Sequence, residues 1–542
     1  MSQGPNQQAA ARPRPEHTPA PIRAVYRLRA RPEEAERLAE KIAFEQTVEL
    51  PPALVTDAEI RERVVARVES VDPDPASGEH FLARLAYPQH LASGQLSQLL
   101  NLLYGNVSIL PDIRLMDVAL PDSLLHAFRG PTHGIQGVRG MLGVFDRPLL
   151  ATALKPRGLP DEKLAEMAGA FARGGGDIVK DDQNLVSADF EDFKHRVRAC
   201  FEAVERANQA TGRRCLYFPH LSAPAGELQR RMDYLQWLGV SGVLACPMVL
   251  GLDTARALIQ ARGMVYMAHP ALTGSYTGSF EQGIDHGVLL GTLFRLGGAD
   301  ISVFPNFGGR FSFTRDQCRS IRRRLRGHLG QLAPALPCPA GGMRFENLAD
   351  MCADYGSDAV FLIGASLLGY SDDLQDSTRA FQERIREHFD ERLETPLERA
   401  APDPDAAARK AGRLLEHLAF RDGFTWEGRD IQPYKIGGSL SHKGSRRIEL
   451  VGQHGERTDF DLRYFEIAPG GHTSLEKHLH THVIIGARGQ GRLTSGDRDL
   501  TVRPMDVAYV PPLRTHQLSN PGEEPFGFFC IVDHERDRPM TP

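Results

Sequence analysis

The run LLATALKP at residues 149–156 is short, apolar and rich in β-formers, and a loop and then a segment with helical spacing follow it. The same order recurs as far as Asp390, in runs at 177–182, 216–221, 242–249, 264–270, 299–305, 335–342 and 359–366. Eight strands alternating with helices in roughly 240 residues match the size and order of a (β/α)8 TIM barrel. Polar, Gly and His residues gather at the C-terminal ends of the runs, where such a barrel carries its active site. We therefore predict a TIM barrel over residues 146–394.

The segments on either side of the barrel have other patterns. Residues 23–145 mix helical stretches with apolar runs and predict an α+β domain. In residues 416–542 short strands alternate with turn signals (PGG, RGQG, SGDRD, NPGEE), which predicts a small all-β barrel or sandwich. Residues 395–415 combine Pro, Ala and charge and predict a linker, and residues 1–22 predict a disordered tail. With 542 residues, the chain is expected to be multi-domain.

Composition excludes several classes of protein. Lys and Arg number 64 against 69 Asp and Glu, a net charge of −5 without a dense basic run, so we expect no nucleic-acid partner. The seven cysteines form no CxxC pair, which favours a reducing compartment over disulfides or structural zinc. No apolar stretch reaches the roughly 18 to 20 residues of a membrane helix, and the first residues lack a signal-peptide core, so we expect no membrane partner and a cytoplasmic location.

The sharpest local motif is GGGDIVKDDQNL at 174–185, at the end of the second predicted barrel strand. Lys180 and Asp182 alternate onto the same side of that strand and so both face the barrel mouth. Oxygen ligands there favour a hard cation such as Mg²⁺. A lysine repels a cation unless CO2 carbamylates it, which turns the ammonium into an oxygen-donor anion. The alternative interpretation is a purely structural salt bridge.

Around this motif the chain resembles the RuBisCO superfamily over about residues 23–390. The matching motifs are ALKPR (153–157), GGGDIVKDDQ (174–183), MAHP (267–270), PAGGM (339–343) and LIGAS (362–366), with EQTVELP (45–51) and YGN (104–106) upstream. The resemblance implies a homodimer with shared active sites, in which Glu45 and Asn106 serve the neighbouring subunit's barrel. It also implies carbamylated Lys180 with Asp182 as Mg²⁺ ligands, Lys155 as acid/base, a substrate contact from His269, and backbone N–H groups of Gly341, Gly342 and Gly364 for a phosphate.

Several positions depart from the carboxylating enzymes. Gln183 stands in place of a second carboxylate ligand, although its amide oxygen can still coordinate. Pro270 replaces a phosphate-binding Arg, Ala340 replaces a substrate-binding Ser, and Arg310 in SVFPNFGGRF (302–311) matches only ambiguously a lysine that polarises CO2. These changes predict an enolising relative without CO2 fixation, in which a lysine moves a proton beside a cation-bound carbonyl.

Each of these residues also has a plainer interpretation. Lys155 could be a solvated strand-end lysine, His269 a hydrogen-bonded structural histidine, and the glycines simple turn formers.

The C-terminal segment PGGHTSLEKHLHTH (469–482) carries a second cluster of potential ligands. Period-2 alternation puts Glu476, His478, His480 and His482 on one face of a strand, and His516 on a later strand can join them. The pattern resembles the metal motifs of cupins over roughly 445–533, with His482 in place of the usual glutamate. By that resemblance we predict Glu476, His478, His482 and His516 as ligands of Mn, Fe, Co or Ni. The alternative is a His-rich exposed strand without metal.

The fusion of these two domains predicts successive reactions on one small sugar phosphate. Related families include enzymes that isomerise 5-methylthioribulose 1-phosphate to 1-methylthioxylulose 5-phosphate, after which a cupin removes the methylthio group to leave 1-deoxyxylulose 5-phosphate. We take this bifunctional salvage enzyme as the leading hypothesis. The alternatives are another sugar-phosphate activity, such as decarboxylation of 3-oxo-isoapionate 4-phosphate, and a sensor that binds a sugar phosphate without turnover.

Overall fold

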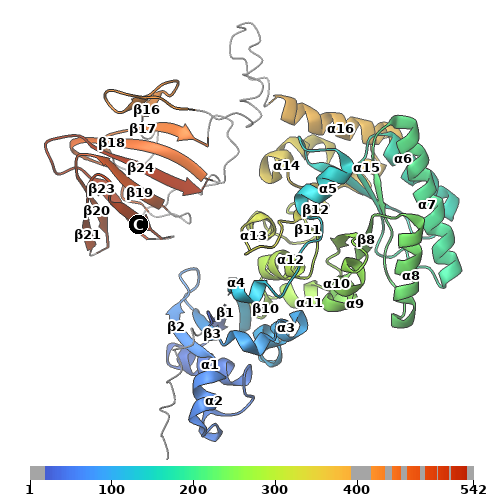
Figure 1. Cartoon of the computed structure of the whole chain (residues 1–542), viewed down its shortest axis with the longest axis horizontal. Helices are drawn as coiled ribbons and strands as arrows, with labels where there is room; N and C mark the ends of the chain where they lie inside the picture. The colour runs from blue at the N-terminus through green and yellow to red at the C-terminus, as the bar shows by residue number, and fades with distance from the viewer. Residues whose placement is uncertain are drawn as a thin grey trace, which may run out of the picture. The chain divides into compact units, whose positions relative to one another are not determined.

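The computed structural model describes residues 19–391, 417–433, 442–452, 460–476, 482–496, 498–511 and 514–533. The chain divides between Thr395 and Pro396 into two compact units (Figure 1). The predicted linker at 395–415 lies outside the described residues. In the part of the chain that is described, no helix combines the length and apolar character needed to cross a membrane.

All eight predicted barrel strands are present and parallel. They are β5 (Leu149–Leu154), β6 (Ile178–Asp181), β7 (Leu216–Phe218), β8 (Gly242–Ala245), β9 (Val265–Ala268), β11 (Ile301–Pro305), β12 (Leu336–Ala340) and β13 (Val360–Leu362). Their order is β7-β6-β5-β13-β12-β11-β9-β8, and a parallel bridge between His220 and Leu244 joins the two ends. The predicted TIM barrel is therefore confirmed.

Helices surround the barrel strands (Figure 1). The main ones are α6 (Asp161–Arg173), α7 (Phe190–Thr211), α8 (Ala225–Leu238), α10 (Leu252–Gln260), α13 (Arg315–Arg326), α14 (Leu348–Tyr355) and α16 (Leu374–Glu391). The predicted strand run at 242–249 ends early, because Pro247 begins the short helix α9 (Pro247–Leu250). Ile178, Met267 and Val303 of the barrel belong to one buried apolar cluster with residues of helix α5 (Gly134–Leu142), so α5 packs against the barrel's apolar interior.

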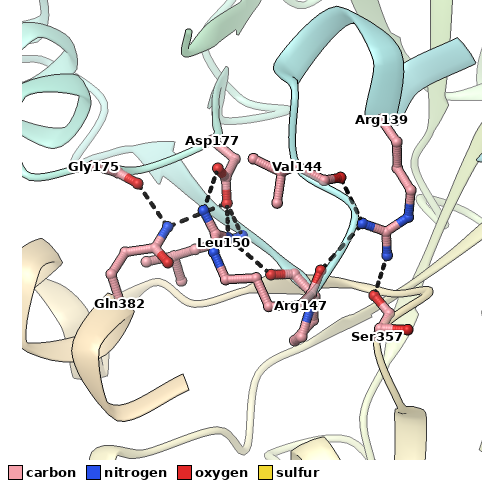
Figure 2. Close-up of polar contacts among 9 residues, drawn as sticks. Arg139, Val144, Arg147, Leu150, Gly175, Asp177, Ser357 and Gln382 are labelled. Carbon is pink, nitrogen blue, oxygen red and sulfur yellow. Dashed lines mark hydrogen bonds and ion pairs between the residues drawn. The ribbon is translucent and has the colours of Figure 1, made fainter. Parts of the chain in front are cut away.

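A buried polar network lies at the N-terminal ends of β5 and β6 (Figure 2). The Arg147 guanidinium donates to both carboxylate oxygens of Asp177, at 2.7 and 3.0 Å, and both side chains are about 95% buried. The same carboxylate accepts from the Leu150 backbone N–H at 2.7 Å and from Gln382 of α16 at 3.2 Å. Arg139 of α5 donates to the carbonyls of Val144 and Arg147. The network therefore ties α5, β5, β6 and α16 together, away from the ends of the strands that carry the candidate site.

The N-terminal part is α+β, as predicted. Its sheet has the order β10-β4-β1-β3-β2, built from β1 (Ile22–Arg29), β2 (Arg67–Pro73), β3 (His80–Tyr87), β4 (Ile113–Ala119) and β10 (Gly283–Ile284). The principal helices are α1 (Pro32–Glu45) and α3 (Leu96–Tyr104). Strand β10 belongs by sequence to the barrel and pairs in parallel with β4. Residues 1–18 of the predicted tail lie outside the described residues, and Ile22 is buried and starts β1.

The C-terminal unit is an antiparallel β structure, which confirms the predicted all-β class. Its longer strands are β17 (Lys443–Val451), β18 (Phe460–His472), β19 (His482–Arg488), β20 (Gly491–Ser495), β21 (Arg498–Val502), β22 (Val507–Val510), β23 (Gln517–Ser519) and β24 (Phe526–Asp533). Strand β18 pairs with β17, β23 and β24. Phe465, Ile484 and Phe528 belong to the core between these strands.

Candidate active site

Strand β6 separates its charged residues by alternation, as the sequence predicts. The Asp181 carboxylate accepts from the Tyr217 hydroxyl at 2.7 Å, the His220 backbone N–H at 3.0 Å and Arg196 at 3.2 Å. These bonds hold Asp181 in a fully buried structural network. Lys180 and Asp182, the residues on either side of Asp181, lie on the opposite face of the strand, toward the barrel mouth.

Lys155 and Asp182 form an ion pair across two neighbouring strands. Lys155 Nζ lies 2.5 Å from Asp182 Oδ2, and the lysine side chain is 40% exposed while the carboxylate is nearly buried. The Asn184 backbone N–H donates to the other carboxylate oxygen at 3.1 Å. Burial opposes ionisation of Asp182, but the hydrogen bonds from Lys155 and Asn184 outweigh it and lower the pKa. The pair therefore presents an accessible ammonium beside an ionised carboxylate.

Lys180 is a buried amine. Its side chain is 1% exposed, and Nζ donates to the Asp181 carbonyl oxygen at 3.0 Å. Burial lowers its pKa to about 8, against the opposing attraction of Asp182. A fraction of the lysine is therefore a neutral amine near neutral pH, and the neutral amine is the form that reacts with CO2.

The chemistry of these donors bears on the predicted Mg²⁺. As an amine, Lys180 supplies no oxygen ligand, whereas a carbamate at the same atom joins the Asp182 carboxylate and the half-buried Gln183 amide as hard oxygen donors. These donors would therefore fit a divalent cation if Lys180 were carbamylated.

His269 follows β9 and is held as a neutral imidazole. The Ala271 backbone N–H donates to its Nδ1 at 3.2 Å. Burial, with Lys180 close by, lowers the His269 pKa well below its ordinary value. His269 is thus placed near the predicted lysine site, as the sequence indicates.

Two further residues of the same rim were not predicted from the sequence. His220 follows β7 and Cys246 follows β8, and the Cys246 sulfur lies 3.6 Å from His220 Nε2 and 3.8 Å from His269 Nδ1. In the sequence, Cys246 is one of seven isolated cysteines. Only the order of the strands around the barrel brings it between two histidines.

The glycine-rich loops after β11 and β12 approach each other closely. A Cβ on Gly342 would lie 2.7 Å from the backbone nitrogen of Gly309, and Gly341 and Gly342 have φ of 79° and 70°. These conformations and contacts require glycine. Gly364 precedes the short helix α15 (Ala365–Leu368) after β13. Arg310, in the β11 loop, is exposed and stacks on the Phe311 ring at 4.9 Å.

Glu45 and Asn106 meet on the N-terminal part. Asn106 Nδ2 donates to Glu45 Oε1 at 2.9 Å and to Glu49 Oε1 at 3.1 Å. Glu45 and Leu50 also line a surface cavity of about 650 Å³. The structure therefore places Glu45 and Asn106 in contact with each other, and these are the two residues that the resemblance predicts to serve the active site of a neighbouring subunit.

In the C-terminal unit three of the predicted ligands lie close together. Glu476 and His516 form an antiparallel bridge, with backbone hydrogen bonds of 3.1 and 2.9 Å, and the rings of His482 and His516 are 5.0 Å apart. Ser474 donates to Glu476 at 2.9 Å. His516 Nδ1 lies 2.9 Å from the Arg514 carbonyl oxygen, which assigns its proton to Nδ1 and its lone pair to Nε2.

The two remaining histidines of that motif, His478 and His480, lie outside the described residues. Among the described residues no group of three His, Cys, Asp or Glu side chains has the arrangement of a metal site. A carboxylate and two imidazoles suit a first-row transition metal by donor chemistry, and His478 is the ligand needed to complete the predicted set. The cupin metal therefore stays a prediction.

Comparison with known proteins gives the family. A model of the ribulose bisphosphate carboxylase large chain, catalytic domain, matches residues 134–387, and a cupin domain model matches residues 463–532. The ribulose bisphosphate carboxylase-like protein 1 of Rhodopseudomonas palustris is 39% identical over 369 residues, which cover 68% of this chain and 98% of that protein. The 5-methylthioribulose-1-phosphate isomerase of Rhodospirillum rubrum is 38% identical over 363 residues, covering 66% and 95%.

A more distant relative and a crystal structure indicate the same family. The 2,3-diketo-5-methylthiopentyl-1-phosphate enolase of Geobacillus thermodenitrificans is 31% identical, covering 64% of this chain and 86% of that protein. The crystal structure of a Rubisco-like protein from Rhodopseudomonas palustris matches with a TM-score of 0.61 and 35% identity, covering 68% of this chain and 99% of that one. The chain therefore belongs to the RuBisCO large-chain family, among its non-carboxylating RuBisCO-like enzymes of the enolase and isomerase type, and carries a C-terminal cupin domain.

Proposed function

We propose that the barrel isomerises 5-methylthioribulose 1-phosphate to 1-methylthioxylulose 5-phosphate and that the cupin then transfers the methylthio group to a thiol co-substrate to give 1-deoxyxylulose 5-phosphate. The thiol leaves as a mixed disulfide with the methylthio group, and its hydrogen replaces that group on the sugar. The observation that carries the first step is the cluster of Lys155, Asp182 and buried Lys180 at one end of the barrel. The 38% identity to an isomerase of that name supports the choice of substrate.

The first step moves a carbonyl along a sugar chain without net oxidation. The carbonyl moves from C2 to C4 of the substrate, so two enolisations are needed. C3 first loses a proton and C2 gains one through a C2–C3 enediolate, and then C4 loses a proton and C3 gains one through a C3–C4 enediolate. Lys155 is the group we assign to these transfers, because its amino group is partly exposed and lies beside Asp182 at the strand ends. It takes the proton from carbon as the neutral amine and returns it as the ammonium. A divalent cation held by carbamylated Lys180, Asp182 and Gln183 would supply Lewis acidity at the carbonyl when bound. His269 Nε2 would donate a hydrogen bond to the same oxygen.

The strand ends that face this site support a substrate with a single phosphate. Gly341, Gly342 and Gly364 offer backbone N–H groups for one phosphate, at the ends of β12 and β13. On the neighbouring strands, the ends of β9, β11 and β12 carry Pro270, Pro305 and Ala340, which have no charged group for a second phosphate. A substrate that carries a small apolar thioether where a bisphosphate would carry its second phosphate is compatible with these uncharged residues.

We also propose that two chains share their active sites in a homodimer. Glu45 and Asn106 are hydrogen-bonded to each other on the N-terminal part, and Leu54 and Ile109 beside them in sequence are 64% and 81% exposed. On the rim of the barrel, Leu272, three residues beyond His269, is 53% exposed. A two-fold pairing that covers both apolar surfaces would complete two sites at once.

For the cupin we propose one transition-metal ion held by Glu476, His478, His482 and His516. The bridge between Glu476 and His516 and the 5.0 Å approach of His482 support a common site. The metal would differ from the barrel's, because imidazoles favour first-row transition metals and an all-oxygen set favours Mg²⁺.

The test is incubation of the whole enzyme with 5-methylthioribulose 1-phosphate, Mg²⁺, bicarbonate, Mn²⁺ and dithiothreitol, in D2O. Phosphorus and proton NMR should show migration of the carbonyl with deuterium uptake and then loss of the S-methyl signal from the sugar. Persistence of both the original C2 carbonyl and the S-methyl signal would reject the proposal. Uptake of deuterium with an intact thioether would keep the isomerase and reject the cupin step, whereas binding without any exchange would indicate a sensor.

A further inference from the structure

Three consecutive strands of the closed barrel end in His220, Cys246 and His269. The bridge between His220 and Leu244 brings β7 beside β8, and β8 pairs with β9. The Cys246 thiol sits between the two imidazoles, 3.6 Å from His220 Nε2 and 3.8 Å from His269 Nδ1. His220 is 5% exposed and Cys246 is 6% exposed. Neither has a role in holding the cation or the phosphate proposed above.

The surroundings of His269 fix its tautomer. Its Nδ1 accepts the Ala271 backbone N–H at 3.2 Å, so Nδ1 carries a lone pair. Burial together with Lys180, His220 and Lys155 lowers its pKa well below the ordinary value, and the opposing attraction of Asp182 is smaller. The ring is therefore neutral, and its one proton is on Nε2.

The thiol is a donor in this arrangement. Burial raises the Cys246 pKa to about 11, so the sulfur keeps its proton near neutral pH. Burial also lowers the His220 pKa to about 4, so His220 is neutral. If His220 Nε2–H donates to the sulfur, and the thiol donates to His269 Nδ1, each proton has an acceptor. His220 Nδ1, which is buried with no hydrogen-bond partner among the described residues, is then a bare acceptor and not an unpaired N–H.

We propose that Cys246, backed by His220, is a positioning residue that holds His269 as a neutral Nε2–H donor aimed at the substrate oxygen on which charge develops. The proposal rests on the isomerase function proposed above and assigns it two residues. A neutral donor stabilises developing negative charge without placing a third cation beside Lys155 and Lys180. Orientation matters here, because a small misplacement of a donor removes much of its effect on the transition state.

Two variants of Cys246 form a matched pair for the test. Cys246→Ala and Cys246→Ser both remove the sulfur, but serine keeps an O–H donor. With 5-methylthioribulose 1-phosphate we expect Cys246→Ala to lower kcat by roughly 10-fold to 10²-fold with KM within about twofold, and Cys246→Ser to recover most of the loss. His220→Phe, which removes the group behind the thiol, should lower kcat in the same direction. Equal activity of Cys246→Ala and wild type, or equal loss in both Cys246 variants, would overturn the proposal.

A second measurement needs no turnover. In enzyme with ¹⁵N-labelled histidine, the His269 signals of wild type and Cys246→Ser should report a single sharp neutral Nε2–H tautomer. In Cys246→Ala the tautomer should stay the same, because the Ala271 N–H still donates to Nδ1, but the signals should broaden, because the ring has lost the contact that orients it. Observation of an Nδ1–H tautomer or an imidazolium in wild type would overturn the inference. If wild type shows the expected tautomer but no exchange with the sugar phosphate, the proposed substrate is wrong and the assignment of Cys246 stands.

Discussion

The ion pair of Lys155 with Asp182 joins an accessible cation to a nearly buried anion, and the first prediction concerns it. Lys155→Ala should lower solvent-deuterium exchange into the ketose phosphate by roughly 10² to 10⁴, the range for loss of a general acid/base. Stability should change little, because the lysine is 40% exposed and the Asp182 carboxylate keeps the Asn184 backbone N–H and the attraction of Lys180. The control is Lys163→Ala, which removes an exposed lysine paired with Glu166 on α6. A similar loss of deuterium exchange in both variants would show that Lys155 is not the general acid/base.

The second residue-scale prediction concerns Lys180 and pH. CO2 adds to the neutral amine, and the pKa of about 8 means that the neutral fraction rises as pH increases through 8. With the dissolved CO2 concentration held constant, activation with Mg²⁺ should therefore accelerate between pH 7 and pH 9, and Lys180→Met should abolish it. Measurement of exchange after preincubation at each pH, assayed at one common pH, separates activation from turnover. Full activity in CO2-free buffer without Mg²⁺ would contradict the assignment.

At this scale the sequence predicts some site residues and misses others. Strand alternation separates Lys180 and Asp182 from Asp181, because side chains of a strand point to opposite faces. Cys246 and His220 have no such signal. They are 26 residues apart on different strands, and only closure of the barrel places one against the other. The strand predicted through 476–482 falls partly outside the described residues and stays a prediction.

Among the elements, the network around Asp177 (Figure 2) links α5, β5, β6 and α16 through one carboxylate. Arg147→Met should destabilise the barrel by about 3 to 5 kcal/mol, because it leaves a buried carboxylate without its cation. Arg84→Met, which breaks an exposed pair with Asp72, should cost less than about 1 kcal/mol.

Urea denaturation can measure both variants. The chain has two tryptophans, so Trp426→Phe leaves Trp237 of α8 as the reporter of the barrel unit. Equal midpoints for the Arg147 and Arg84 variants would show that the buried network contributes no more than a surface pair.

The positions of helices and strands were predictable where the spacing of apolar residues and the Gly, Pro and polar residues between the runs indicate the same boundaries. Each barrel strand lies within its predicted run, because most of these buried parallel strands are short, largely apolar stretches bounded by polar residues. Strand β6 is the exception, since it ends in Lys180 and Asp181. One of the helical stretches within residues 23–145, predicted from the sequence at 90–103, is interrupted, since Ser93 and Gly94 have φ of 50° and 63° and separate a short 3-10 turn from α3. Left-handed backbone at a serine has no clear sequence signal.

For the whole molecule, a homodimer predicts complementation between inactive chains. A mixed dimer of Lys155→Ala and Asn106→Ala chains should regain part of the activity, because one of its two sites then combines an intact barrel with an intact neighbour. Exchange activity of unfolded and co-refolded mixtures measures this, and differently tagged chains verify the mixed dimer. No recovery in verified mixed dimers would argue against shared sites.

Because the barrel and the cupin are separate units, we expect deuterium exchange and methylthio release to depend on two different metal ions. In the full chain, His478→Ala and His482→Ala should each remove the bound transition metal and methylthio release while leaving deuterium exchange by the barrel unchanged. Elemental analysis after reloading with Mn, Fe, Co or Ni, paired with the exchange assay, tests this. Metal content near zero in the reloaded wild type would remove the cupin step from the proposed function.

Strand β10 sets an order of events during synthesis of the chain. The N-terminal sheet receives Gly283–Ile284 beside β4, although β4 ends at Ala119. At roughly 5 to 20 residues per second, a ribosome needs on the order of ten to thirty seconds to make the intervening chain. For that time one side of β4 has no permanent partner, and an open strand edge is prone to pair with other chains. The first sheet to emerge is therefore completed only after five of the eight barrel strands have been made, and the nascent chain has to protect that edge until then.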